Sequence, residues 1–123
     1  MYVLSQRSKD RLKGVKPELV KVVERAIQIT EIDFMVIEGL RSVEQQKENV
    51  RKGVSKTMNS YHLTGEAVDL GPLVNKAIPW QDWSKFELVA KAMKQAANEL
   101  GIAIEWGGDW KTFKDGPHFQ LKR

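Results

Sequence analysis

The sequence predicts an α+β fold, in which helices pack on a small, mostly antiparallel sheet. Two long segments carry apolar residues at helical spacing, which indicates amphipathic helices. Several short apolar runs end at glycines or turn residues, which indicates strands. The chain has 123 residues, of which 41% are hydrophobic and 29% charged. This size and composition suit one domain with a single core, so we expect residues 1–123 to form a single domain.

Two long helices and one short helix are expected. The first long helix should begin near Pro17, since proline is favoured in the first helical turn. The second should cover residues 84–100 and end at Gly101. Between them, Ser42 can cap a short helix that reaches Arg51 and stops at Gly53. The inner faces of the long helices would comprise Leu19, Val22, Val23, Ala26 and Ile27, and Phe86, Val89, Ala90, Met93, Ala96, Ala97 and Leu100.

Four short strands complete the predicted fold. They are expected over residues 33–39, 66–70, 102–106 and 117–121. Gly71-Pro72 should break the second strand, and Gly107-Gly108 should force a tight turn after the third. Residues 55–61 are expected to form a loop, and we assign no element to the polar residues 7–14.

The two histidines of the chain each lie near a carboxylate. His62, Asp69 and His118 could form a three-ligand zinc site with a fourth position open for water. Asp115 could then be the general base. The chain has no cysteine, which excludes thiolate ligands and disulfides. A lone histidine is more often structural than a ligand, and the His-x₆-Asp spacing is not specific. The spacing alone therefore leaves both interpretations open.

Longer motifs around these residues resemble the M15 family of zinc peptidases. Residues 60–69 follow the pattern Ser-x-His-x-x-Gly-x-Ala-x-Asp, and residues 115–119 follow Asp-x-Pro-His-Phe. Further similarity in residues 39–46 and 105–110 extends the resemblance from about Leu19 to Leu121. The short chain and its Gly-Gly-Asp-Trp segment most resemble the phage endolysin branch of the family.

This resemblance implies a fold like that of Hedgehog proteins and DD-peptidases, and it implies roles for particular residues. His62, Asp69 and His118 correspond to the zinc ligands of the family, and Asp115 corresponds to its acid/base. Arg41 corresponds to an arginine that faces the substrate cleft. Its guanidinium can stabilise a developing oxyanion or bind a peptide carboxylate.

Five further residues remain open between substrate contact and structural roles. Gln46 can contact substrate or serve in polar packing, and Ser60 can contact substrate or hydrogen-bond locally. Trp106 and Trp110 can line the groove or the core. Asp109 can be a hydrogen-bonding partner of a ligand histidine or of Arg41, or a simple turn residue.

The function implied by the resemblance is that of a zinc-dependent endolysin. Such an enzyme hydrolyses the L-alanyl-D-glutamate bond of peptidoglycan stem peptides during host lysis. The alternatives are a D-alanyl-D-alanine carboxypeptidase or dipeptidase, and a non-catalytic zinc or wall-binding module of the same fold. Asp115 argues against the module, which needs no base beside the metal. The net charge of +4 alone would favour nucleic acid, but it leaves the His/Asp constellation unexplained.

No apolar run has the length of a signal peptide or a membrane span. We therefore expect a monomer in the cytoplasm of the host cell, without stable membrane association. It would act on the wall in the periplasm after a holin-type protein permeabilises the membrane.

Overall fold

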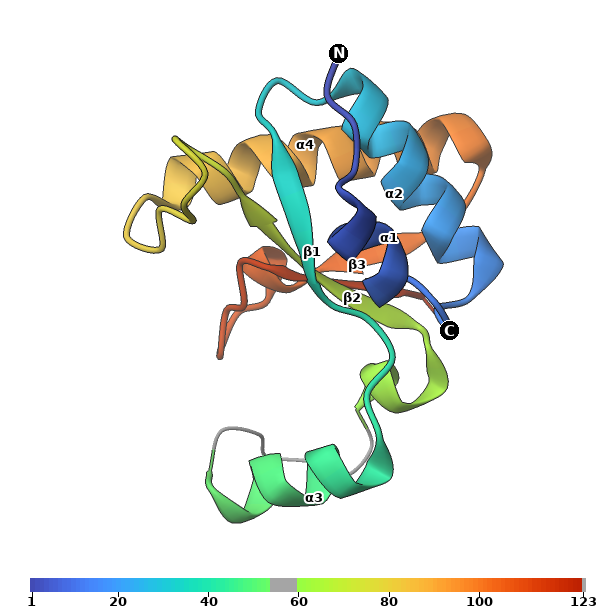
Figure 1. Cartoon of the computed structure of the whole chain (residues 1–123), viewed down its shortest axis with the longest axis vertical. Coiled ribbons are helices and arrows are strands. Elements are labelled where there is room, and N and C mark those ends of the chain that lie inside the picture. Colours follow the sequence, from blue (N-terminus) through green and yellow to red (C-terminus); the bar gives the residue numbers. More distant parts are fainter. Residues whose placement is uncertain (54–59, 123) are drawn as a thin grey trace.

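A four-stranded antiparallel sheet lies at the centre of the fold (Figure 1). The computed structural model describes residues 1–53 and 60–122. The strands are β1 (Phe34–Glu38), β2 (Ala67–Pro72), β3 (Ile104–Trp106) and β4 (His118–Leu121), and their spatial order is β1-β2-β4-β3. All strand pairs of this sheet are antiparallel, which confirms the predicted fold class.

The helices are unevenly distributed around the sheet. They are α1 (Gln6–Arg11), α2 (Pro17–Ile29), α3 (Val43–Arg51) and α4 (Trp83–Leu100), with the short 3-10 helices η1 (Tyr61–Thr64) and η2 (Gly107–Asp109). The long helices α2 and α4 pack on each other, and α4 also contacts β2 and β3. The shorter α3 lies at the opposite end of the molecule from α2 and α4 (Figure 1). None of the described helices is both long enough and apolar enough to cross a membrane.

Alternation along the strands separates a core face from a polar face. Val68 and Leu70 on β2 and Phe119 on β4 are fully buried in the core. Asp69 lies between the first two, and His118 precedes Phe119, so both project from the other face of the sheet. The hydrophobic pattern that builds the core therefore also brings polar side chains together on the face opposite the long helices.

The predicted helix signals are confirmed. Pro17 occupies the first position of α2, and all five residues of its predicted apolar face are buried. Ser42 caps α3 by accepting a hydrogen bond from the Gln45 amide at 3.0 Å. Gly101 ends α4 with a left-handed φ of 69°. The inner face of α4 is as predicted except at its last residue, since Leu100 is 43% exposed.

Three predictions along the chain require comment. A short helix, α1, occupies residues assigned to no element; its buried Ser8 accepts a hydrogen bond from the Val36 amide at 2.9 Å. The predicted break at Gly71-Pro72 is wrong, because β2 continues through both residues. The Leu70 amide still donates to the Pro117 carbonyl just before β4, whereas Gly71 and Pro72 pair with β1 alone, so the missing amide hydrogen of Pro72 does not interrupt pairing with β4. Of the predicted loop, residues 55–59 lie outside the described residues, and Tyr61 begins η1.

Candidate metal centre

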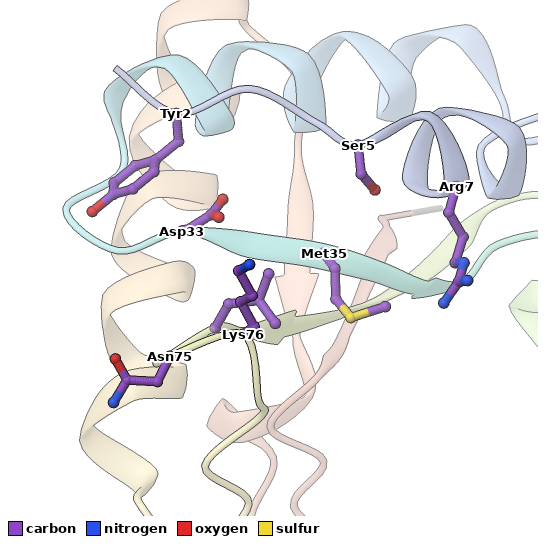
Figure 2. A pocket seen from close by; sticks show the side chains of 8 residues that line it. Tyr2, Ser5, Arg7, Asp33, Met35, Asn75 and Lys76 are labelled. Carbon is purple, nitrogen blue, oxygen red and sulfur yellow. The ribbon is translucent and has the colours of Figure 1, made fainter.

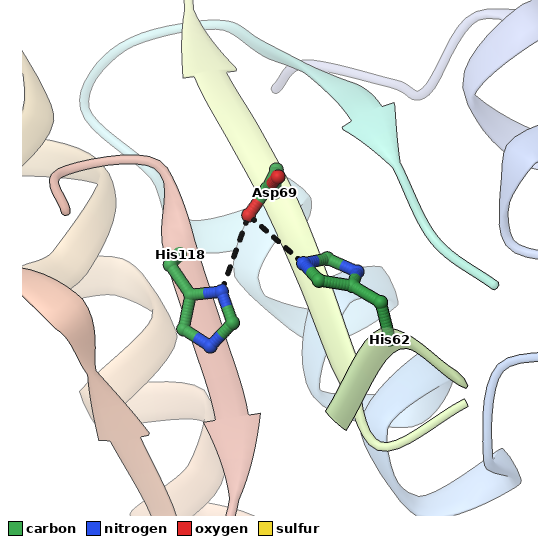
Figure 3. Close-up of side chains that lie close together, drawn as sticks. All are labelled: His62, Asp69 and His118. Carbon is green, nitrogen blue, oxygen red and sulfur yellow. Dashed lines mark ion pairs between the residues drawn. The ribbon is translucent and has the colours of Figure 1, made fainter. Parts of the chain in front are cut away.

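His62, Asp69 and His118 converge on one point above the polar face of the sheet (Figure 3). One ligand atom from each residue can be chosen so that all three lie within 4.8 Å of one another. The residues come from η1, β2 and β4, and the antiparallel register places Asp69 directly opposite His118. Rigid strands thus hold two of the three side chains, and the sequence prediction that these residues lie together agrees with the structure.

Local backbone structure orients His62. Ser60 caps η1, and its side chain accepts a hydrogen bond from the His62 amide at 3.2 Å. Gly65 ends η1 with a left-handed φ of 75°, a conformation that glycine adopts readily, and this returns the chain toward β2. The Nδ1 atom of His62 lies 2.8 Å from the Gly39 carbonyl oxygen, and Nε2 lies 3.3 Å from Oδ1 of Asp69. A carbonyl oxygen accepts hydrogen bonds, so Nδ1 carries a hydrogen, and in a neutral ring Nε2 then presents a lone pair.

The Oδ1 atom of Asp69 lies between two ring nitrogens. It is 3.3 Å from Nε2 of His62 and 3.4 Å from Nδ1 of His118, along the dashed lines of Figure 3. Neither contact has hydrogen-bond geometry, and this buried oxygen has no hydrogen-bond partner among the described residues. A buried carboxylate oxygen without a hydrogen bond is unfavourable unless a cation satisfies it. The donor set therefore fits a divalent metal ion bound by nitrogen and oxygen.

The charges of this cluster reinforce one another. Burial raises the pKa of Asp69, but its contacts with His118 and His62 outweigh burial and hold that pKa far below the ordinary range. Burial lowers the pKa of His118, but its contacts with Asp69 and Gln120 outweigh burial and raise it. In the absence of a metal ion, Asp69 is thus an anion that attracts positive charge to this point.

Asp115 lies in the segment that leads into β4. Its carbonyl oxygen accepts a hydrogen bond from the His118 amide at 3.2 Å, and its amide donates to the Gly107 carbonyl at 3.0 Å. Burial and the negative charge of Asp69 raise the pKa of the Asp115 carboxyl group, while His118, His62 and Arg41 lower it to a smaller extent. This carboxylate therefore belongs electrostatically to the cluster of His62, Asp69 and His118.

Arg41 is held in a fixed orientation between two neighbours. Its Nε atom donates to the Glu38 carboxylate, and Nη1 donates to Oε1 of Gln46 at 2.6 Å. The Arg41 side chain is only 12% exposed, and Gln46 is fully buried. The Arg41 amide also donates to the His62 carbonyl at 3.0 Å, which ties this segment to η1. Gln46 therefore supports Arg41 from inside the fold. This arrangement corresponds to polar packing, which is one of the two roles considered for Gln46.

The tryptophans and Asp109 of the following segment have distinct environments. Trp106 is buried, stacks on Phe119 and donates its Nε1 hydrogen to the Gly116 carbonyl at 2.7 Å. The Trp110 ring lies beside the His118 ring, with centroids 5.2 Å apart. Asp109 forms an ion pair with Lys94 of α4 at 2.7 Å. Trp106 is thus a packing residue of the segment before β4, and Trp110 flanks a candidate ligand.

A separate cavity of about 590 Å³ shares no residue with this cluster. Figure 2 shows its walls, which come from the N-terminal segment, β1 and the turn after β2. Arg7, Asp33 and Lys76 line it together with Tyr2 and Met35, so it combines both signs of charge with apolar surface. Nothing in this lining selects a ligand.

Sequence patterns did not identify several residues that support the cluster. The Gly39 carbonyl orients His62, and Glu38 orients Arg41. Gln120 contacts the His118 ring through a hydrogen bond of 2.8 Å. A backbone carbonyl has no sequence signal. The alternation of β4 is a signal for Gln120, because residues 118 and 120 share a face of the strand.

The model of the phage L-alanyl-D-glutamate peptidase family matches residues 1–121. The chain belongs to this family. The resemblance indicated by the two motifs is thereby confirmed. The L-alanyl-D-glutamate peptidase of Escherichia phage T5 is 38% identical over 125 residues, which cover 99% of this chain and 90% of that protein.

Two solved structures share the fold of this chain. The L-Ala D-Glu endopeptidase ChiX of Serratia marcescens is 46% identical and superposes with a TM-score of 0.91, over 98% of this chain and 90% of that one. The vancomycin-resistance D,D-dipeptidase VanXYg is only 16% identical, with a TM-score of 0.51 over 87% of this chain and 50% of that one. This second likeness shows the fold alone, and it agrees with the DD-peptidase-like fold expected from the sequence.

Proposed function

We propose that this chain is a zinc-dependent endolysin that hydrolyses the L-alanyl-D-glutamate bond of peptidoglycan stem peptides. In this proposal His62, Asp69 and His118 hold the zinc ion, and Asp115 is the general acid and base. Membership of the phage L-alanyl-D-glutamate peptidase family supports the reaction. The observation that carries the metal site is the buried Oδ1 atom of Asp69, which lies between two imidazole nitrogens without a hydrogen-bond partner among the described residues.

The catalytic chemistry requires an electrophilic centre and a proton carrier. A zinc ion held by these ligands would polarise the scissile carbonyl and lower the pKa of the attacking water. Asp115 accepts a proton from that water and returns it to the amine that leaves with D-glutamate. The raised pKa of Asp115 supports the first of these steps, because a carboxylate with a higher pKa is a stronger proton acceptor.

Arg41 supplies positive charge beside the reacting groups. Its contacts with Glu38 and Gln46 restrict the guanidinium to one orientation, so little conformational entropy is lost on binding an anion. We propose that it binds a carboxylate of the stem peptide or stabilises the oxyanion that forms during attack. Ser60, whose side chain accepts from the His62 amide, is proposed to position that ligand, with substrate contact as a second role.

The bond that is cut can be identified from the products. Purified peptidoglycan would be digested with the zinc-loaded chain, and the fragments analysed by mass spectrometry after labelling of new amino groups. Hydrolysis at the proposed bond leaves a new N-terminal D-glutamate on the stem peptide. Release of D-alanine without new D-glutamate termini would instead identify a carboxypeptidase.

The metal assignment is tested separately by metal content. The purified chain should bind about one zinc ion, as expected for a three-ligand site. His118→Ala and Asp69→Asn should lose most of this zinc, because each removes one ligand. Asp109→Asn is the matched control, since Asp109 is an exposed carboxylate paired with Lys94 and should leave zinc content unchanged. Full zinc retention in His118→Ala would contradict the assignment.

The remaining expectations concern the whole enzyme. We propose that residues 1–123 act as one catalytic domain, supported by the single hydrophobic core and the family match over residues 1–121. Action as a monomer, and access to the wall through a holin-type protein, stay predictions. Comparing loss of turbidity between intact and permeabilised cells would test the dependence on membrane permeabilisation.

A further inference from the structure

Gln120 connects His118 to a carboxylate on the neighbouring strand. It lies two residues after His118 on β4, so both side chains project from the same face of the sheet. Its Oε1 atom is 2.8 Å from Nε2 of His118, and its Nε2 atom donates to Oε2 of Glu105 at 3.2 Å. Glu105 is the direct partner of Gln120 in the antiparallel pairing of β3 with β4. The sheet register therefore produces a linear hydrogen-bond network from Glu105 through Gln120 to His118.

Glu105 fixes which groups donate and which accept in this hydrogen-bond network. A carboxylate only accepts hydrogen bonds, so the amide nitrogen of Gln120 faces Glu105 and the amide oxygen faces His118. An amide oxygen also only accepts, so Nε2 of His118 must carry a hydrogen. In a neutral imidazole the other nitrogen then has the lone pair. That nitrogen is Nδ1, which lies 3.4 Å from Oδ1 of Asp69 at the candidate metal site.

The two histidines thus present different nitrogens to the same point. His62 gives its Nδ1 hydrogen to the Gly39 carbonyl and presents Nε2. His118 gives its Nε2 hydrogen to Gln120 and presents Nδ1. A backbone carbonyl can only accept a hydrogen bond. A glutamine amide, in contrast, can rotate by half a turn and present its nitrogen, which is a donor, in place of its oxygen. The tautomer of His118 therefore depends on a side chain that must itself be held.

We propose that Gln120 and Glu105 are positioning residues that keep His118 in the tautomer whose Nδ1 atom can bind the metal ion. Glu105 prevents the Gln120 amide from rotating, and Gln120 holds the imidazole hydrogen away from the metal site. The inference rests on the proposed metal site at His62, Asp69 and His118. It predicts that both residues set metal affinity although neither is a ligand.

Zinc affinity in competition with a chromophoric chelator provides the main test. Gln120→Leu removes the acceptor at similar size and should weaken zinc binding about 10–100-fold, as is usual for partners of ligand histidines. Glu105→Gln should weaken binding less, since it permits the Gln120 amide to rotate. The exposed Gln81→Leu is the control and should bind zinc like the wild type. Unchanged affinity in Gln120→Leu would overturn the proposal.

An exchange of the two side chains separates polarity from packing. In the double variant Gln120→Glu with Glu105→Gln, the carboxylate at position 120 accepts from His118, and the amide at position 105 donates to it. Position 120 thus again presents a fixed acceptor to His118, while the hydrogen bond between positions 105 and 120 runs in the reverse direction, so zinc affinity should recover above that of Glu105→Gln alone. The exchange leaves the combined size of the two side chains nearly unchanged, so no recovery would overturn the proposed role of a fixed acceptor facing His118.

The tautomer itself can be measured by nitrogen NMR of the imidazole rings in the metal-free protein, at a pH where both rings are neutral. With two histidines in the chain, His118 should show its hydrogen on Nε2 and His62 on Nδ1. A His118 ring with its hydrogen on Nδ1 would overturn the proposal. A wild-type chain that binds no zinc would instead overturn the proposed function, so the two failures are distinguishable.

Discussion

Asp115 is the residue whose chemical role can be tested with the smallest change. Asp115→Asn keeps the shape of the side chain but cannot accept a proton, so turnover should fall about 10²–10⁴-fold. Zinc content and thermal stability should stay close to those of the wild type. The rate at which amino groups appear in digested peptidoglycan measures this effect, with Asp109→Asn as a matched carboxylate control. Near-normal turnover would contradict the assignment of Asp115 as the general base.

Substitution of Arg41 can show whether the geometry of its guanidinium contributes to catalysis beyond its positive charge. Arg41→Lys keeps the positive charge but loses the planar, forked donors that contact Glu38 and Gln46. We expect kcat/KM on wall fragments to fall, because an ammonium group cannot keep the same orientation. Arg25→Lys is the control, since Arg25 pairs with Glu99 on the exposed surface between α2 and α4. An unchanged kcat/KM in Arg41→Lys would assign Arg41 to a structural role.

The three candidate ligand residues could be predicted from the sequence, whereas the residues that orient them could not. His62, Asp69 and His118 stand in motifs of fixed spacing, and the chemistry of a metal site limits which residues can serve. The residues that orient the candidate ligands are brought to them by contacts between segments that are distant in the sequence. Glu105 meets Gln120 only because β3 pairs with β4 in one register. The contact of Gly39 with His62 joins residues from separate segments through a backbone atom.

The segment from η2 to β4 depends on a close backbone approach. A Cβ atom added at Gly107 would lie 2.4 Å from the Asp115 carbonyl oxygen and 3.1 Å from Cβ of His118. Gly107→Ala should therefore displace both candidate functional residues and lower activity and zinc affinity together. The cost in stability should be about 1–3 kcal/mol, as for other overpacked sites. Lys111→Ala, on the exposed part of the same segment, is the control. Full activity in Gly107→Ala would show that the segment can shift without disturbing the site.

Whole elements were predicted best where local signals and core packing agree. Pro17, Ser42 and Gly101 mark helix ends by their own conformational preferences, and the apolar faces of α2 and α4 follow helical spacing. The short α1 lacks such a face, and the buried Ser8 ties it to β1 through a long-range hydrogen bond. Gly71-Pro72 usually signals a strand end, but here β2 has already left β4 and pairs only with β1.

The stability of the metal-free protein and the additional stabilisation by zinc should respond to pH in opposite directions. In the metal-free protein the raised pKa of His118 means that its protonated form stabilises the fold. This contribution is fully present below the ordinary histidine pKa of 6.5 and is lost as pH rises through the raised value. Zinc requires neutral imidazoles, so its stabilisation grows with pH.

Thermal unfolding measures this difference. Between about pH 6 and about pH 8, the Tm of the metal-free protein should fall, while the gain in Tm on adding zinc should increase. The exposed ion pair of Arg25 with Glu99 remains charged throughout this interval and cannot produce the effect. A metal-free Tm that rises over this interval would contradict the stabilising role of protonated His118.

The contact between Trp110 and His118 gives the protein an intrinsic optical reporter. The two rings lie 5.2 Å apart, so the indole senses whether the imidazole is protonated or bound to a metal. A protonated imidazole quenches indole fluorescence on contact, and a metal ion at Nδ1 replaces the proton that would otherwise bind there. Adding zinc at a pH where His118 is protonated should therefore increase the tryptophan emission. Trp110→Phe should abolish most of this change while leaving zinc binding intact. Metal occupancy of the site could then be followed by tryptophan fluorescence, without an added chromophore.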